Sequence, residues 1–191
     1  PTKAEIHQEI KRHKEMAKEN DSVIIYFAGH GKEEEGEGFW LPKDAKPDDD
    51  LNWIANSYIK RKVKSIKARN ILILADSCFS GTLTRELKKV EAIEESLKTY
   101  VSTQTRAVIT AGGIEPVIDD GGSNHSIFAD VLISKLKKYD KPFTSLNLFN
   151  DIRDPILKRS IPFQTQTPFY GELVGQGHEG PDFVFFPKST N

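Results

Sequence analysis

The sequence predicts an α/β fold in which helices cover both faces of a mostly parallel sheet. Three short runs rich in β-branched and other apolar residues, at 23–28, 71–75 and 107–111, are predicted as buried strands. Amphipathic helical patterns lie between and after them. Because helices that alternate with buried strands form crossovers between parallel neighbours, this order predicts one sheet between two helical layers.

The first helix and strand are predicted from periodicity and composition. Residues 3–19 are predicted as a helix because Ile6, Ile10 and Ala17 fall on one face of a 3.6-residue repeat. Residues 23–28 are expected to form a strand covered on both faces, since nearly every side chain in it is apolar.

The remaining elements are predicted from the same two signals, with turn residues between them. A charged loop over 32–38 leads to a short strand at 39–41. Ser57 is expected to cap a helix over about 58–67, and residues 83–97 are predicted to be helical. Later in the chain we expect helices at 125–138 and 145–158, and a last strand at 183–186.

The composition is ordinary for a globular protein and argues against several classes of partner. Of the 191 residues, 37% are hydrophobic and 29% charged, which fits a single domain over 1–191. Because the net charge is −1, we expect neither nucleic acid nor a membrane as partner. No apolar run is long enough to span a bilayer, and the start of the sequence is unlike a signal peptide. The single cysteine excludes an internal disulfide, so we expect a cytoplasmic location.

Two reactive side chains directly follow two of the predicted strands. His30 comes just after the strand at 23–28, and Cys78 just after the strand at 71–75. Sites in such sheets form beyond the carboxyl ends of the strands, so neighbouring strands would bring these side chains together. Cys78 would supply a thiolate nucleophile and His30 a proton for the leaving amine. The N–H groups of Gly31 and Cys78 are the expected oxyanion donors.

A structural role for both side chains is the alternative interpretation. A lone histidine or a lone cysteine is more often structural than catalytic, and spacing alone leaves both interpretations open. Small residues beside them, such as Gly31 and Gly81, weaken the structural interpretation.

The segments around these two residues form a pair of motifs. Residues 26–31 read Tyr-Phe-Ala-Gly-His-Gly, and residues 76–81 read Asp-Ser-Cys-Phe-Ser-Gly. Together they resemble the two signature segments of the caspase-like cysteine peptidase superfamily, above all those of metacaspases, paracaspases and their bacterial relatives. The spacing of 48 residues from His30 to Cys78 is similar to the roughly 50 expected in caspases.

The resemblance covers nearly the whole chain and implies a caspase-like three-layer fold. Residues 106–128 and 166–186 resemble the small-subunit part of bacterial members. Residues 1–97 would then correspond to the large subunit and residues 98–191 to the small one. Two features depart from the family pattern. True caspases carry Gln-Ala-Cys where this chain has Asp-Ser-Cys, and the strand and helix that usually open the fold are expected to be missing.

The resemblance also implies a substrate with a basic P1 residue. Asp76 lies two residues before Cys78, so in extended backbone the two side chains point the same way. In metacaspases and paracaspases an Asp at this position lines the pocket for a basic P1 side chain, and Glu115 matches a second pocket acid of paracaspases. Two carboxylates would attract Arg or Lys and repel Asp. The alternatives are a helix cap for Asp76 and a merely exposed side chain for Glu115.

These features predict a cysteine endopeptidase that uses His30 and Cys78 and cleaves after Arg or Lys. Its expected partners are a protein or peptide substrate and, in a longer chain, the missing N-terminal segment or other domains. The alternatives are a non-catalytic scaffold or regulatory module and a cysteine hydrolase acting on other amides. We expect no cofactor. Some metacaspases need calcium, but the acidic runs at 33–35 and 48–50 are unlike an EF-hand loop, so no obligatory calcium requirement is expected.

Overall fold

The computed structural model describes residues 1–77, 83–86, 102–112, 125–161, 166–173, 175, 177–180 and 182–188. The helices are α1 (Lys3–Met16), α2 (Asn56–Lys64), α4 (Ile127–Leu136) and α5 (Ser145–Ser160), with a 3-10 turn η1 (Asp50–Asn52). The strands are β1 (Ser22–Ala28), β2 (His30–Glu34), β3 (Glu37–Leu41), β4 (Ile54–Ala55), β5 (Asn70–Asp76), β6 (Thr84–Glu86), β7 (Thr105–Thr110), β8 (Phe143–Thr144), β9 (Phe169–Leu173) and β10 (Val184–Phe185).

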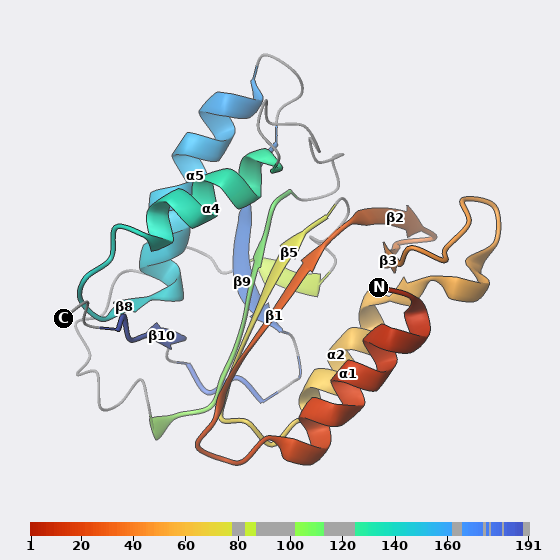
Figure 1. Ribbon diagram of the computed structural model, residues 1–191, viewed down its shortest axis with the longest axis horizontal. Coiled ribbons are helices and arrows are strands. Elements are labelled where there is room, and N and C mark those ends of the chain that lie inside the picture. The colour runs from red at the N-terminus through yellow and green to blue at the C-terminus, as the bar shows by residue number, and fades with distance from the viewer. Residues whose placement is uncertain are drawn as a thin grey trace.

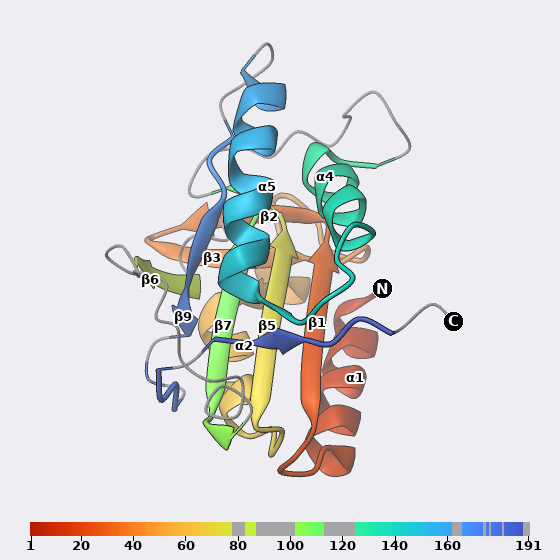
Figure 2. The same ribbon diagram turned by 90° about the vertical axis from the view of Figure 1, so that its left-hand side faces the viewer.

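Three neighbouring parallel strands form one side of the main sheet, as the sequence predicts. The strand order is β1-β5-β7-β9-β6, and β5 is parallel to both β1 and β7. β9 is antiparallel to β7, and β6 is antiparallel to β9. Figure 2 shows β1, β5 and β7 side by side and pointing the same way. Two small sheets, β2-β3-β4 and β10-β8, complete the described strands.

Helices cover both faces of this sheet, which confirms the predicted three-layer fold. Figure 1 shows α1 and α2 on one face and α4 and α5 on the other. β5 is buried over its whole length and contributes to both layers. Ile71 and Ile73 pack into the cluster under α1 and α2, whereas Leu72 and Leu74 pack into the cluster under α4 and α5. This alternation follows from the two-residue repeat of a strand.

Side-chain caps mark the starts of three helices. In α1 the Thr2 side chain accepts the N–H of Glu5, and the Glu5 side chain accepts the N–H of Thr2. A similar box of Thr144 and Asn147 opens α5, and Ser126 caps α4. These bonds satisfy N–H groups that the first turn of a helix leaves without partners. In the part of the chain that the structure describes, no helix has the length and apolarity to cross a membrane.

Several predictions of helices, strands and loops were wrong, because the amino-acid composition of those segments does not indicate how their strands pair. Residues 32–38, predicted as a loop, belong to the antiparallel hairpin of β2 and β3, which turns at Glu35 and Gly36 with positive φ angles. Residues 84–86, predicted to be helical, form β6, while residues 87–97 lie outside the described residues. Helix α2 starts at Asn56 with Ala55 as its N-cap residue, although Ser57 was the predicted cap, and the N–H of Ser57 donates to the Glu37 carboxylate of β3 at 2.8 Å.

β1 also differs from its prediction, because it is an edge strand. Ile24 and Tyr26 are 47% and 48% exposed, although both faces of this strand were expected to be covered. The alternate residues Ile25 and Phe27 face α1 instead and line a groove of about 280 Å³. Among the described strands, β5 is the one neighbour of β1 in the sheet. The apolar composition of β1 therefore reflects strand propensity and one covered face rather than full burial.

Candidate active site

The carboxyl ends of β1 and β5 meet at the edge of the sheet where the sequence predicts the site. Ala28 at the end of β1 lies opposite Asp76 at the end of β5. Just beyond this pair, the backbone N–H of Gly29 donates to the carbonyl of Asp76 over 3.2 Å. The segments that lead into His30 and Cys78 therefore leave the sheet side by side (Figure 2).

His30 is the first residue of β2 and is exposed to solvent. It pairs with Leu41 of β3, and the next residue, Gly31, pairs with Trp40. Trp40 is buried and stacks on Phe27 of β1, with ring centroids 4.2 Å apart. This stack joins the hairpin to the end of β1, and Figure 1 shows β2 continuing from the upper end of β1.

The motif around His30 requires a small residue at position 29. A Cβ atom added at Gly29 would lie 3.1 Å from Cζ of Phe27, which is tighter than ordinary packing allows. The Phe27 ring has little room to move, because Trp40 stacks on it. Glycine at this position thus keeps both the stack and the short turn into His30.

Asp76 is almost completely buried, with 5% of its surface exposed. Its Oδ2 atom accepts hydrogen bonds from the Ser126 hydroxyl at 2.5 Å and the Tyr26 hydroxyl at 3.2 Å. A buried carboxylate is stable only where donors of this kind surround it. Both of these donors are neutral hydroxyl groups.

The two hydroxyl donors are fixed by elements on either side of Asp76. Ser126 caps α4 by accepting the N–H of Ala129 at 2.9 Å, which leaves its own proton for Asp76. Burial and the negative charge of Asp76 raise the pKa of Tyr26 far above its ordinary range, so the phenol keeps its proton. Tyr26 lies in the first motif and Ser126 in the segment 106–128, but sequence reasoning gave neither a role. The available signals were the serine just before a helix and the strand repeat, which puts Tyr26 on the same face as Ala28.

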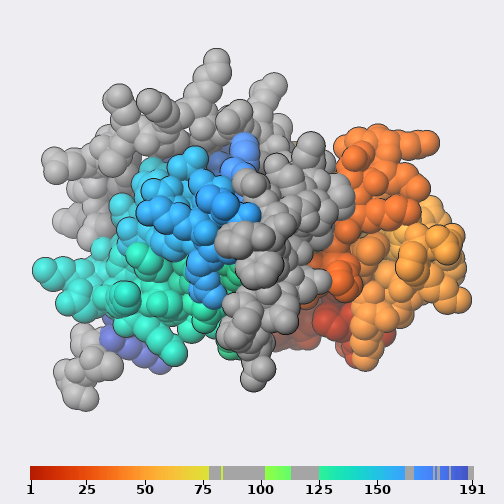
Figure 3. All heavy atoms as spheres, turned by 90° about the horizontal axis from the view of Figure 1, so that it is seen from above, coloured from red at the N-terminus to blue at the C-terminus, as the bar shows by residue number. Residues whose placement is uncertain are grey.

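The structure brings some of the predicted site residues together and leaves others outside its description. His30 and Asp76 lie at the same edge, with Gly31 next to His30 in β2. Cys78 and Glu115 lie outside the described residues, and Ser77, which is buried, is the last one before that gap. Figure 3 looks onto this edge, with the β2–β3 hairpin in orange on one side and α4 and α5 in teal and blue on the other.

The acidic runs considered for calcium make local contacts. Glu33 accepts the N–H of Gly36 at 2.7 Å, and Asp49 accepts the N–H of Leu51 at 3.0 Å. Across the described ranges, no group of three or more His, Cys, Asp or Glu side chains is arranged to hold a metal ion.

Comparison with known proteins points to one family. A model of the caspase domain family matches residues 1–172. The chain is 29% identical over 150 residues to metacaspase-6 of Arabidopsis thaliana, and the match covers 72% of this chain and 38% of that protein. The crystal structure of caspase-1 from Spodoptera frugiperda is similar in fold, with a TM-score of 0.62 at 14% identity, covering 100% of this chain and 73% of that one. The chain thus spans 38% of the length of its metacaspase relative.

Proposed function

The chain belongs to the caspase domain family, which indicates a cysteine peptidase kind of function, and from this premise we propose an endopeptidase that uses a His30–Cys78 dyad. The observation that supports the dyad is the register of β1 and β5. Ala28 lies opposite Asp76, and His30 and Cys78 each follow that pair by two residues. Because both residues lie two positions beyond the same cross-strand pair, their side chains are expected to lie at a similar distance from the carboxyl ends of β1 and β5 and to meet there.

The proposed reaction has two steps. The Cys78 thiolate attacks the scissile carbonyl carbon, and the oxyanion that forms is stabilised by the N–H groups of Gly31 and Cys78. His30 donates a proton to the leaving amine as the C–N bond breaks, which leaves an acyl group on the sulfur. Water then attacks the thioester while His30 accepts its proton, and as the C–S bond breaks the acid product is released and the Cys78 thiolate and the protonated His30 are restored. The side chains and backbone supply every group that these steps need, so we propose that the reaction requires no cofactor.

We further propose that the enzyme cleaves after Arg or Lys. The buried carboxylate of Asp76 lies two residues before the nucleophile, and its two hydroxyl donors are neutral. A charge held in this way is complementary to the guanidinium or ammonium group of a basic P1 side chain. By resemblance, Glu115 supplies a second carboxylate to the same pocket. A protein or peptide with a basic P1 residue is therefore the proposed substrate.

A panel of fluorogenic peptides that differ only at P1 tests this proposal. We expect wild type to cleave the peptides with Arg and Lys, to leave the one with Asp intact, and to lose all turnover as Cys78→Ala. Turnover by the purified Cys78→Ala variant would refute the cysteine mechanism, and a preference for Asp at P1 would refute the specificity. If wild type cleaves no peptide and iodoacetamide modifies Cys78 no faster than free cysteine, the non-catalytic interpretation is the better one.

A further inference from the structure

Two hydroxyl groups from different layers of the fold converge on one oxygen of Asp76. Tyr26 donates from the edge strand β1 over 3.2 Å, and Ser126 donates from the start of α4 over 2.5 Å. Asp76 itself ends β5, which is the neighbour of β1 in the sheet. Because both bonds end on Oδ2, they restrict rotation of the carboxylate about its Cβ–Cγ bond.

The orientation of Tyr26 is unusual for a tyrosine at the surface. A tyrosine at the protein surface normally packs its ring against the protein and points its hydroxyl group towards water. Here 48% of the residue is exposed, while the hydroxyl is bonded to a carboxylate of which 5% is exposed. Packing alone does not require this arrangement, because a hydroxyl at an open edge of the sheet has water available as a partner. The hydrogen bond to Asp76 is therefore the specific contact that Tyr26 contributes.

On the basis of the proposed specificity for basic P1 residues, we propose that Tyr26 is a positioning residue for Asp76. Together with Ser126 it holds the carboxylate in the orientation that receives the P1 side chain. The guanidinium group of Arg is planar and pairs with a carboxylate through two directed bonds, whereas Lys acts as a point charge. Loss of the Tyr26 hydroxyl should thus weaken binding of Arg peptides more than binding of Lys peptides.

The Tyr26→Phe substitution isolates this contribution, because it removes the hydroxyl and keeps the ring. Ser126→Ala is less suitable as the main test, since Ser126 also accepts the N–H of Ala129 at the start of α4. A matched control is Tyr139→Phe. Tyr139 also donates to a carboxylate, that of Asp151 at 2.7 Å, but it lies just after α4 and contacts neither Tyr26 nor Asp76 through this bond.

The experiment compares kcat and KM of wild type, Tyr26→Phe and Tyr139→Phe on peptides with Arg or Lys at P1. For Tyr26→Phe we expect KM for the Arg peptide to rise about three- to tenfold, which is less than the loss of a direct bond to a charged group, because Asp76 keeps its charge and its bond from Ser126. We expect a smaller rise for the Lys peptide and little change in kcat. The rate of Cys78 alkylation and the Tm should stay at the wild-type values. Tyr139→Phe should resemble wild type throughout.

The possible results of this experiment distinguish the proposed role of Tyr26 from the proposed peptidase function. A wild type that cleaves basic peptides together with an unchanged KM in Tyr26→Phe rejects the role of Tyr26 and leaves the proposed function standing. An equal loss on both peptides with slower Cys78 alkylation assigns Tyr26 a merely structural role, which also overturns the inference. If wild type cleaves no basic peptide, the proposed function itself has failed, and the inference fails with it.

Discussion

The indole ring of Trp40 stacks on the ring of Phe27 with their planes only 4° apart. The two rings come from the strands on either side of β2, the strand that begins with His30. Phe27 precedes the histidine in β1, and Trp40 lies in β3 opposite Gly31. The stack thus anchors the hairpin that begins with His30 to the sheet, as the proposed role of His30 as proton donor requires.

The first prediction concerns the dyad. Cys78→Ala should abolish peptide hydrolysis, and His30→Ala should lower kcat by about a thousandfold or more, because each removes a group that touches the reacting atoms. Steady-state kinetics on a peptide with Arg at P1 measures both effects. His30→Ala should also slow the alkylation of Cys78 by iodoacetamide near neutral pH, since an imidazolium next to a thiol favours the thiolate. Wild-type kinetics in either variant would contradict the assignment.

The second prediction is that hydrolysis does not depend on calcium. Glu33 and Asp49, one from each acidic run, bond backbone N–H groups of their own loops. Carboxylates engaged in local turns are poor starting points for a site that needs six or more oxygen ligands. Activity should therefore be the same after dialysis against a chelator and after readdition of calcium. Loss of activity in chelator that calcium restores would contradict this expectation.

The centre of the fold could be predicted because its strands bury almost every side chain. β5 and β7 are buried at every position, so their runs of apolar residues could be recognised without any contacts. The β2–β3 hairpin could not be recognised in this way. Its charged residues, such as Glu33 and Glu34, are exposed. In a two-stranded hairpin of this kind, the charged composition indicates that the residues are exposed but does not indicate that they pair as strands.

The same distinction applies to the candidate site: local sequence predicts some of its features, and tertiary packing determines the others. The positions of His30 and Asp76 at one edge of the sheet could be predicted, because each lies at or just after the end of a predicted strand. The contacts of Tyr26 and Ser126 with Asp76 could not be predicted. They depend on the register of β1 against β5 and on the position at which α4 starts, 50 residues along the chain from Asp76. Both are set by tertiary packing rather than by local sequence.

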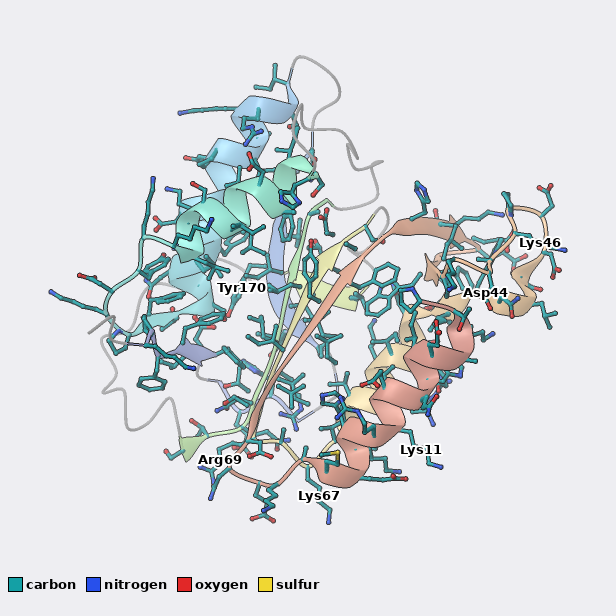
Figure 4. All side chains as sticks on the ribbon, in the orientation of Figure 1. Lys11, Asp44, Lys46, Lys67, Arg69 and Tyr170 are labelled. Atoms are coloured by element: carbon teal, nitrogen blue, oxygen red, sulfur yellow. The ribbon has the colours of Figure 1, made fainter. Side chains whose placement is uncertain are left out.

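The third prediction concerns Arg106, a guanidinium that is 1% exposed. It donates to the carbonyls of Arg69 at 2.6 Å and Ala68 at 2.8 Å, and so it holds the loop between α2 and β5. Figure 4 shows Arg69 at the end of the sheet opposite the site. Burial lowers the pKa of Arg106 to about 10, which still leaves it charged at neutral pH. Arg106→Met should lower the free energy of unfolding by about 3–5 kcal/mol, because several buried carbonyls lose their donor.

Urea unfolding followed by circular dichroism measures this change. Arg153→Met is the matched control, since Arg153 is about half exposed and pairs with Asp154 at the surface. Little change is expected in the control, as for most surface ion pairs. Equal stability of Arg106→Met and wild type would contradict the structural role.

The fourth prediction is a loss of stability on the acid side that depends on His178. Burial lowers the pKa of this side chain, against the opposing effect of Glu172 and Asp182, and its Nδ1 accepts the N–H of Arg106 at 3.1 Å. The neutral ring is therefore favoured in the folded state. As the pH falls below about 6.5, the unfolded chain binds a proton that the folded chain does not, so the free energy of unfolding decreases.

Urea unfolding at several values between pH 7 and pH 5 tests this sign. His178→Gln should reduce the pH dependence, but it should not remove it, because burial also lowers the pKa of His7. A pH dependence in His178→Gln as steep as in wild type would show that other groups cause it.

The last prediction concerns Asp76 and Glu115, the two acids of the proposed P1 pocket. Asp76→Ala should lose far more activity on basic peptides than Glu115→Ala, while Cys78 alkylation remains largely intact. Asp76→Asn should lose nearly as much, since it keeps the shape and removes only the charge. The reason is electrostatic: a desolvated carboxylate beside a P1 guanidinium contributes on the order of several kcal/mol, and an Asp at P1 would meet a repulsion of similar size. Measuring kcat/KM and alkylation on the same preparations separates a pocket role from a folding role, because a folding defect lowers both. If Asp76→Asn keeps its activity on Arg peptides, the buried carboxylate only links β5 to α4, and the substrate class proposed for this enzyme is wrong.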